Sequence, residues 1–310
     1  MDAPGKTVLI AANPKSGTAS SAERVQQLKS KLDGLGLPAE IIGDLGYLQQ
    51  RASQLATDGK LRCVVSAGGD GTVSAVANLL DRETPILVFP LGTENLLAKH
   101  YGLTTDIEKT AECIVANRQT TMDVGLANGK LFLVMLSVGF DALVVQHMTA
   151  IRRGHINRWS YARPIIGAMS QYKFPKLNFR VDGVAPTGVD TPQSGPAWLF
   201  VFNVPRYAAN LQFCPQADPS DGRLDLCTFA RRGLMSGLGY FSQLWLGRHQ
   251  SLAGFQHRRI ERIEIDAAGD GEPEIPYQID GDFGGVLPLN IQIAPSRLRL
   301  IITDAGNKHL

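Results

Sequence analysis

The chain has 310 residues, of which 44% are hydrophobic, and its formal net charge is +2 at pH 7. This length suffices for two domains, and the near-neutral charge argues against a mainly nucleic-acid partner. The apolar runs are all too short to span a bilayer. Four widely spaced cysteines form no C-x-x-C pair, which predicts a reduced, cytoplasmic protein with neither a zinc site nor a disulfide framework.

The first 124 residues alternate apolar runs with helical patterns. Continuous apolar or β-branched runs predict strands at residues 7–12, 39–42, 61–67 and 85–89. Helical spacing follows each of them, at residues 20–35, 47–56, 73–80 and 96–101, and a further helix is predicted at 106–117. This alternation is typical of an α/β domain with an open, mainly parallel sheet.

Three of these strands end in polar, glycine-containing loops, at residues 13–18, 68–72 and 90–95. Ligands of open parallel sheets gather at the carboxyl ends of the strands, so we expect the loops to share one site. Glycine lets a ligand approach the backbone, and a helix N-terminus favours a phosphate. Within the second loop we expect Thr72 to cap the following helix and Asp70 to hold Mg²⁺ or accept a proton.

Beyond residue 124, short β-like runs alternate with loops rich in glycine, proline and threonine. Strands are predicted at residues 130–138, 177–181, 198–203, 224–229, 260–265, 276–279, 289–294 and 298–302, and helical patches at 142–171 and 234–246. The pattern predicts a β-rich, antiparallel, sandwich-like domain over residues 125–296. The first domain then spans residues 1–124, and the chain end at 297–310 is expected to return to it.

Six motifs occur in a characteristic order and spacing: Asn13-Pro14-Lys15-Ser16-Gly17, Gly68-Gly69-Asp70-Gly71-Thr72, Pro90-Leu91-Gly92-Thr93-Glu94-Asn95, Val138-Gly139-Phe140-Asp141-Ala142, Asp221-Gly222-Arg223-Leu224-Asp225-Leu226 and Gln278-Ile279-Asp280-Gly281-Asp282. With them the chain resembles, over nearly its whole length, the diacylglycerol kinase catalytic-domain family of lipid kinases in its small soluble bacterial form. Sphingosine kinases and, more distantly, NAD kinases are related to that family. The last two motifs favour the lipid-kinase branch.

The resemblance implies an NAD kinase/diacylglycerol kinase-like fold and an ATP- and Mg²⁺-dependent lipid kinase. The acceptor would be a hydroxyl of a lipid such as diacylglycerol, phosphatidylglycerol or a sphingoid base, and the reaction would need positioning and charge neutralisation. Lys15 either pairs with a phosphate or is a solvated loop lysine. The nucleotide contacts implied are Asn13, Pro14, Lys15, Ser16, Gly17, Gly68, Gly69, Asp70, Gly71, Thr72, Gly92, Thr93 and Asn95.

The resemblance also implies a general base, which in the family is the acid that ends a Q-x-D-G-E motif. Here that position is Asp282, a carboxylate one methylene shorter. A base must reach hydrogen-bonding distance of the acceptor hydroxyl, so Asp280 and Asp70 remain alternative catalytic residues. Read alone, residues 280–285 are an ordinary Asp/Gly turn.

A structural Mg²⁺ site is likewise implied by the family's D-G-x-L motif. Its ligands would be the Asp221 side chain and the backbone carbonyls of Asp218 and Arg223. Oxygen ligands of this kind suit Mg²⁺. The alternative is a plain turn at residues 219–222.

Three positions depart from the family pattern. Leu96 replaces an aspartate that would form an acidic network with Asp70 and Asp123. Gly43-Asp44 stands where the family often has threonine, and residues 207–210 replace a Gly-Gly loop on the lipid side. These departures leave the usual diacylglycerol activity open.

Basic and aromatic residues without an acid fill residues 152–176, a composition typical of an interfacial segment. Residues 231–259 are similar but weaker, and in both segments the aromatic residues could instead belong to the core. We therefore expect a cytoplasmic kinase that associates peripherally with the membrane surface, where its lipid substrate lies. The alternatives are a kinase of a soluble substrate, as in NAD kinases, and a nucleotide- or lipid-binding sensor whose catalysis has lapsed.

Overall fold

The computed structural model describes residues 5–12, 19–151, 172, 174–184, 196–207, 211–268 and 274–303. The chain divides into two compact units, one formed by Met1–Val124 with Pro295–Leu310 and the other by Gly125–Ala294. The predicted nucleotide contacts Asn13, Pro14, Lys15, Ser16 and Gly17 lie outside the described residues. So does most of the basic and aromatic segment 152–176.

The first unit is an α/β domain with a parallel sheet, as predicted. Its strands are ordered β2 (Ala39–Ile42), β1 (Thr7–Ala12), β3 (Leu61–Gly68), β4 (Pro85–Pro90) and the end of β17 (Leu289–Ile301). All of these neighbours pair in parallel. The helices are α1 (Ala19–Gly34), α2 (Leu45–Thr57), α3 (Asp70–Leu79), α4 (Leu96–His100) and α5 (Ile107–Ala116).

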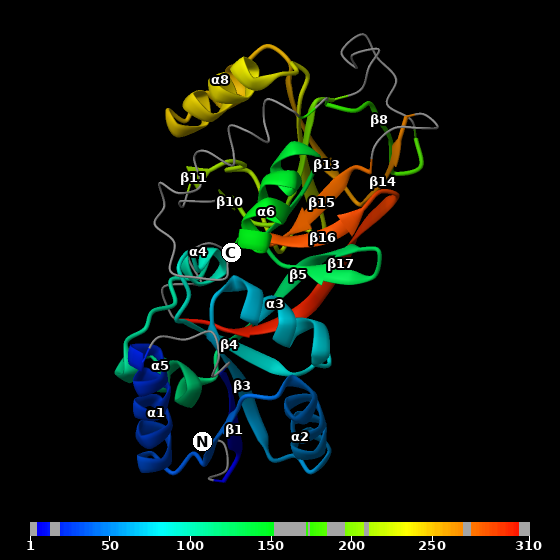
Figure 1. Cartoon of the computed structure of the whole chain (residues 1–310). Coiled ribbons are helices and arrows are strands. Elements are labelled where there is room, and N and C mark those ends of the chain that lie inside the picture. The colour runs from blue at the N-terminus through cyan, green and yellow to red at the C-terminus, as the bar shows by residue number, and fades with distance from the viewer. Residues whose placement is uncertain are drawn as a thin grey trace. The chain divides into compact units, whose positions relative to one another are not determined.

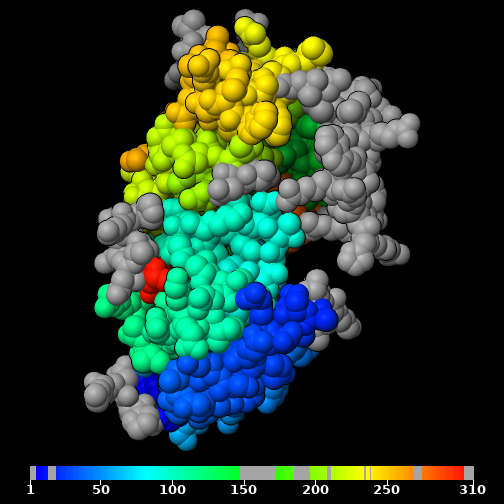
Figure 2. Space-filling view, turned by 90° about the vertical axis from the view of Figure 1, so that its left-hand side faces the viewer, coloured from blue at the N-terminus to red at the C-terminus, as the bar shows by residue number. Residues whose placement is uncertain are grey.

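Helices cover both faces of this parallel sheet. Helices α1 and α5 lie side by side on one face, and α2 and α3 cover the other (Figure 1 and Figure 2). Alternate residues of β1 therefore meet opposite layers, and Val8, Leu9 and Ile10 are all fully buried. This two-sided cover explains why the strands are continuous apolar runs.

The second unit contains a six-stranded antiparallel sheet. Its order is β13 (Phe255–Ile260), β12 (Leu224–Phe229), β9 (Trp198–Phe202), β7 (Met135–Val138), β15 (Pro276–Ile279) and β16 (Asp282–Val286). A second layer is formed by β8 (Leu177–Val181), β14 (Arg262–Ala267) and the start of β17, paired antiparallel. The remaining elements are β5 (Gln119–Ala127), β6 (Lys130–Phe132), α6 (Phe140–Ile151), β10 (Arg206–Tyr207), β11 (Leu211–Gln212), α8 (Leu234–Trp245) and η3 (His249–Ser251).

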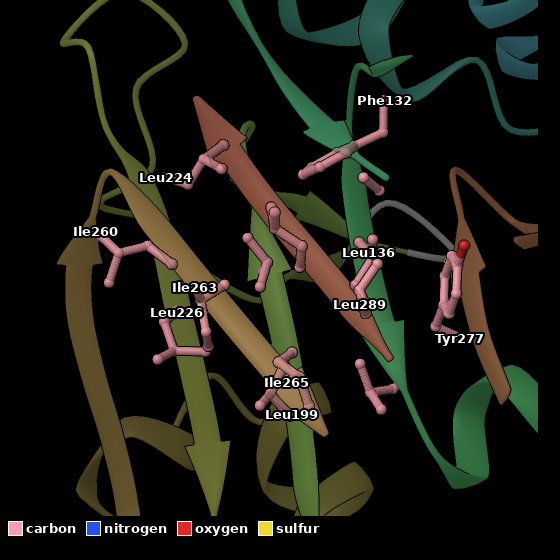
Figure 3. Close-up of a cluster of buried hydrophobic side chains, with 14 of the residues drawn as sticks. Phe132, Leu136, Leu199, Leu224, Leu226, Ile260, Ile263, Ile265, Tyr277 and Leu289 are labelled. Carbon is pink, nitrogen blue, oxygen red and sulfur yellow. The ribbon is translucent and has the colours of Figure 1, made fainter. Parts of the chain in front are cut away.

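A hydrophobic core fills the space between these two layers (Figure 3). Leu224 and Leu226 of β12 point into it and meet Ile263 and Ile265 of β14. Each buried aliphatic side chain contributes about 1.5–3 kcal/mol, so this core supplies much of the unit's stability. The intervening residues of β12 point to the opposite face of the sheet.

The structure corrects several predicted boundaries in the second half. The strand predicted at 130–138 is interrupted between β6 and β7, and that at 260–265 is divided between β13 and β14. The two strands predicted at 289–294 and 298–302 form one strand, β17, although it contains Pro295. Strand β5 was not predicted. Among the described residues, no helix combines the length and apolar character needed to cross a bilayer.

Candidate active site

Asp70 connects two of the glycine loops of the first unit. It is the first residue of α3, and its Oδ2 accepts a hydrogen bond from the Leu96 amide at 2.9 Å. Its Oδ1 accepts one from the Leu97 amide at 3.1 Å. These are the first two amides of α4, so the carboxylate satisfies donors that the helix itself leaves free. Burial raises the pKa of Asp70, and the two amides act in the opposite direction.

The two loops also touch through their backbones. A Cβ atom on Gly92 would lie 2.3 Å from Cα of Gly69, which is far inside van der Waals contact. The Leu91 amide donates a 3.0 Å hydrogen bond to the Gly68 carbonyl. Glycine at position 92 is therefore required for the close approach of the loops.

Asn95 shapes the second loop from inside. It adopts the left-handed conformation, with φ of 50°. Its Oδ1 accepts from the Gly92 amide at 3.1 Å, and its Nδ2 donates to the Gly92 carbonyl at 2.7 Å. Thr93 is exposed on this loop, and Gly71 is exposed on the preceding one.

The predicted helix cap at Thr72 is wrong. Helix α3 already begins at Asp70, and its N-cap is Gly69, which has no side chain to accept a hydrogen bond. The Thr72 amide donates to the Gly69 carbonyl at 2.9 Å. The sequence pattern placed the helix three residues late because Asp and Gly are also common in turns.

Leu96 and Asp123 have different surroundings from those of the predicted acidic network. The Leu96 side chain is 9% exposed, and its backbone amide rather than a side-chain group contacts Asp70. Asp123 is buried, and its Oδ1 accepts from the Ser296 amide at 2.6 Å. Asp123 thereby fastens the turn in β17 to β5.

In the second unit, Asp280 anchors the connection between β6 and β7. Its Oδ2 accepts from the Leu133 amide at 2.8 Å, and its Oδ1 accepts from the amides of Val134 at 2.8 Å and Met135 at 3.1 Å. Its own amide donates to the Met135 carbonyl at 2.9 Å. These contacts explain why the strand predicted at 130–138 is interrupted.

Asp282 is the exposed acid of this motif. Asp280 and Gly281 form the two-residue turn between β15 and β16, with φ of 49° and 86°. Gln278 holds the turn, because its Oε1 accepts from the Gly281 amide at 2.8 Å. Asp282 begins β16 with an exposed side chain, which makes no hydrogen bond or ion pair with any residue that the structure describes. The motif is thus a turn that presents an exposed carboxylate.

Asp141 is a second acidic residue near Gln278, and no role was predicted for it from the sequence. Oδ2 of Asp141 accepts from Ser137 Oγ at 2.6 Å, and Oδ1 accepts from the Tyr207 hydroxyl at 2.6 Å. Burial raises the pKa of Asp141, opposed by hydrogen bonds from Ser137, Tyr207 and Gln278. Burial and the nearby Asp141 charge raise the pKa of Tyr207. The one available signal was a single acid within residues 131–145, which are apolar except for Asp141 and Ser137 and include one glycine.

The predicted metal ligands lie in a turn before β12. Asp221 Oδ1 accepts from the Arg223 amide at 2.9 Å, while Oδ2 is buried and has no hydrogen-bond partner in the described part of the chain. Its nearest cation is Arg259, at 3.5 Å. The Asp218 carbonyl accepts a long, 3.4 Å bond from the Asp221 amide.

Burial raises the pKa of Asp221, with nearby Asp218 and Asp225 adding to the rise. Asp221 Oδ2, which makes no hydrogen bond with a described residue but lies 3.5 Å from Nη1 of Arg259, and the weakly engaged Asp218 carbonyl are oxygen ligands of the kind that suits a hard cation. The alternative prediction was a turn at residues 219–222, whereas the backbone hydrogen bond of the structure closes residues 218–221, one position earlier.

Family models match both halves of the chain. Residues 7–127 match the diacylglycerol kinase catalytic domain, and residues 134–302 match the YegS C-terminal NAD kinase beta sandwich-like domain. A diacylglycerol kinase of Mycobacterium tuberculosis is 29% identical over 301 residues, which cover 93% of each chain. One from Bacillus subtilis is 21% identical over 293 residues, or 91% of this chain and 92% of that one.

Solved structures show the same fold at low sequence identity. A putative diacylglycerol kinase from Bacillus anthracis has a TM-score of 0.72 and 20% identity, and the match covers 97% of this chain and 96% of that one. An NAD kinase from Archaeoglobus fulgidus in complex with ATP has a TM-score of 0.52 and 14% identity, and the match covers 98% and 96% of the two chains.

Proposed function

The chain belongs to the diacylglycerol kinase catalytic-domain family, with a YegS C-terminal NAD kinase beta sandwich-like domain, and we propose that it is an ATP-dependent lipid kinase. It transfers the γ-phosphoryl group to a hydroxyl of a lipid such as diacylglycerol, phosphatidylglycerol or a sphingoid base. The observation that carries the proposal is the pair of glycine loops in the first unit, joined by Asp70.

The first unit binds the nucleotide in this proposal. Gly71, exposed in the first turn of α3, and Thr93, exposed in the loop before α4, offer backbone amides, and Thr93 adds a hydroxyl. Amides and the positive end of a helix dipole favour phosphate. Asp70 holds the two loops together, so its role is to position them.

Mg²⁺ bound with ATP would neutralise charge on the transferred phosphoryl group. In the second unit, Asp221 and the carbonyls of Asp218 and Arg223 would hold a separate, structural Mg²⁺. The buried Asp221 Oδ2 supports this assignment, because it has no hydrogen-bond donor among the described residues.

Asp282 accepts the proton of the lipid hydroxyl. Its exposed carboxylate is available for that contact, whereas both oxygens of Asp280 are occupied by backbone amides. Gln278 and Asp280 position Asp282 by fixing the turn that precedes it. Of the three predicted catalytic residues, Asp282 therefore remains the proposed base, and Asp70 and Asp280 are positioning residues.

Peripheral membrane association is part of the proposal, with the kinase acting from the cytoplasm. Helix α8 packs inward through Tyr240, whose ring centroid lies 4.4 Å from that of Phe229. Its other side exposes large apolar side chains: Met235, Phe241, Trp245 and, just beyond the helix, Leu246, which are 60–78% exposed. Figure 2 shows the yellow atoms of α8 at the surface.

The exposed residues Arg231 and Arg248 flank this helix. An apolar helix face bordered by arginines suits the interface of a membrane with anionic lipids. The weaker of the two predicted interfacial segments, residues 231–259, therefore supports this part of the proposal.

The test is a phosphorylation assay with ATP, Mg²⁺ and vesicles of mixed lipids, read by mass spectrometry. A parallel reaction offers NAD⁺ without lipid, because the Archaeoglobus fulgidus NAD kinase shares the fold. The proposal expects a phosphorylated lipid and no NADP⁺. NADP⁺ formation would favour the soluble-substrate alternative, and ATP binding without turnover on any acceptor would favour a lapsed sensor.

A further inference from the structure

The outer face of β12 carries polar residues that the lipid-kinase proposal does not use. Asp225 is 1% exposed and Cys227 is fully buried, and they alternate with the core residues Leu224 and Leu226. His257 of β13 lies directly opposite Cys227 in the antiparallel register. Its Nε2 lies 2.6 Å from Oδ1 of Asp225.

A cysteine from another segment closes this group. Cys214, which follows β11, is fully buried. Its Sγ, a ring nitrogen of His257 and a carboxylate oxygen of Asp225 all lie within 4.8 Å of one another. The Cys214 carbonyl accepts a 3.0 Å hydrogen bond from the Ala217 amide, which fixes the local turn.

The second oxygen of Asp225 is a separate observation. This Oδ2 is buried and finds no hydrogen-bond partner within the described ranges of the chain. A buried carboxylate is ordinarily paired on both oxygens or bound to a metal, because the desolvation of an unpaired oxygen is unfavourable. The His257 contact satisfies only the other oxygen.

We propose that Cys214, Asp225 and His257 form a zinc-binding site, separate from the Asp221 site. One sulfur, one nitrogen and one oxygen ligand match Zn²⁺, whereas Mg²⁺ requires oxygen ligands. Zinc lies about 2.3 Å from sulfur and about 2.0 Å from nitrogen, so tetrahedral ligands are roughly 3.3–3.7 Å apart. The three ligand atoms lie within 4.8 Å of one another, and the 2.6 Å contact between His257 and Asp225 would open to admit the ion.

Binding displaces a proton in a defined way. Zn²⁺ takes the place of the Cys214 thiol proton, which passes to solvent, whereas the neutral imidazole of His257 binds through one ring nitrogen and keeps its N–H on the other. Three protein ligands leave a fourth position for water. The His257 side chain is 24% exposed and gives access to it.

The consequence is a clamp on the loop that precedes β12. Cys214 lies four residues before Asp218, so a zinc ion would fasten the start of this loop to β12 and β13. The sequence predicted no zinc site, because the three ligands come from separate segments and have no motif spacing. Only the strand register brings Asp225 and His257 together.

The experiment measures metal binding by the full chain after removal of metal with a chelator. Zn²⁺ is titrated by calorimetry, and Co²⁺ serves as a spectroscopic probe of thiolate ligation. We expect one Zn²⁺ per chain and a thiolate-to-cobalt charge-transfer band. The variants Cys214→Ser and His257→Gln should weaken Zn²⁺ binding by about tenfold or more and abolish the band or shift it.

Two variants serve as matched controls. Cys113→Ser removes a cysteine of the first unit and should leave Zn²⁺ binding unchanged. Asp221→Asn should do the same, which separates this site from the proposed Mg²⁺ site.

A His257–Asp225 ion pair without metal is the competing explanation. Absence of Zn²⁺ binding by the wild type, or equal binding by the wild type and His257→Gln, would overturn the proposal. Even if Cys214→Ser fails to fold, the cobalt spectrum of the wild type shows whether a thiolate binds the metal, and absence of the charge-transfer band would overturn the proposal. Because metal content is the readout, the result is independent of whether the chain phosphorylates lipids.

Discussion

The carboxylate of Asp70 accepts a 2.9 Å hydrogen bond from the amide of Leu96, which lies 26 positions further along the chain. This contact joins the loop after β3 to the loop after β4. It assigns Asp70 to positioning two helix N-termini, and it follows that changes at Asp70 should act first on nucleotide binding.

Replacement of Asp70 by asparagine tests that role. Asparagine retains the shape but loses the charge, and it offers one oxygen instead of two to the Leu96 and Leu97 amides, so we expect a loss of about 1–2 kcal/mol in the free energy of unfolding. The dissociation constant of ATP should rise about tenfold. Fluorescence titration with an ATP analogue and thermal unfolding measure the two effects.

If Asp70 were instead the general base, Asp70→Asn would abolish turnover while leaving ATP affinity unchanged. If Asp70 is a positioning residue, the substitution lowers turnover and ATP affinity together. The ratio of the two effects therefore separates the alternatives.

Gly92→Ala tests the close approach of the loops. The added Cβ would lie 2.3 Å from Gly69 Cα, so the loops must separate. We expect a loss of about 1–3 kcal/mol in stability and weaker ATP binding, measured by denaturant unfolding and titration. Gly34→Ala is the control, because its Cβ would meet no atom within 4 Å. Equal behaviour of the two variants would show that the loops tolerate separation.

Asp141 should give the stability of the protein a particular pH dependence. Burial raises its pKa in the folded state above the ordinary aspartate value of 3.8, so the folded chain binds this proton more tightly than the unfolded chain does. Between 3.8 and the raised pKa, stability contributed by this group therefore increases as pH falls. Asp141→Asn removes the effect.

The measurement is the free energy of unfolding of the wild type and Asp141→Asn at several pH values. The wild type should gain stability relative to the variant as the pH falls through this window. Tyr207→Phe removes a hydrogen bond that stabilises the charged form, so it should move the gain to higher pH. Parallel curves for wild type and Asp141→Asn would contradict the assignment.

Helix α8 should contribute to membrane binding. Phe241→Ser with Trp245→Ser removes two exposed apolar side chains, which are 60% and 76% exposed. We expect binding to vesicles of phosphatidylglycerol and phosphatidylcholine to fall about tenfold or more in co-sedimentation, since each buried side chain contributes over 1 kcal/mol. Val115→Ser, on α5 and 52% exposed, is the control and should bind as the wild type does.

The sequence predicted the parts of the fold that depend on local patterns. The strands at residues 7–12, 39–42, 177–181, 224–229 and 276–279 are confirmed to the residue. Their apolar periodicity lies within each segment and requires no knowledge of neighbours. The α/β and β-rich character of the two halves follows from the same signal.

The contacts that define the candidate sites could not be predicted from local sequence patterns, because they join residues far apart in the chain. The amides that occupy Asp280 lie about 145 positions earlier in the chain, so no local signal showed that this acid is bound and that Asp282 is exposed. The interruption of the strand at 133–134 has the same origin. The grouping of Cys214, Asp225 and His257 likewise depends on strand register.

Transfer of phosphate from ATP to lipid vesicles by Asp282 variants tests the central claim most directly. Asp282→Asn should retain wild-type stability, because its side chain is exposed and makes no hydrogen bond or ion pair with a described residue, yet lose about 10²–10⁴-fold in turnover. Asp282→Glu, which restores the residue found in the family, should remain active. Asp280→Asn should unfold more readily. Lipid phosphorylation by Asp282→Asn at the wild-type rate would contradict the assignment of Asp282 as the base.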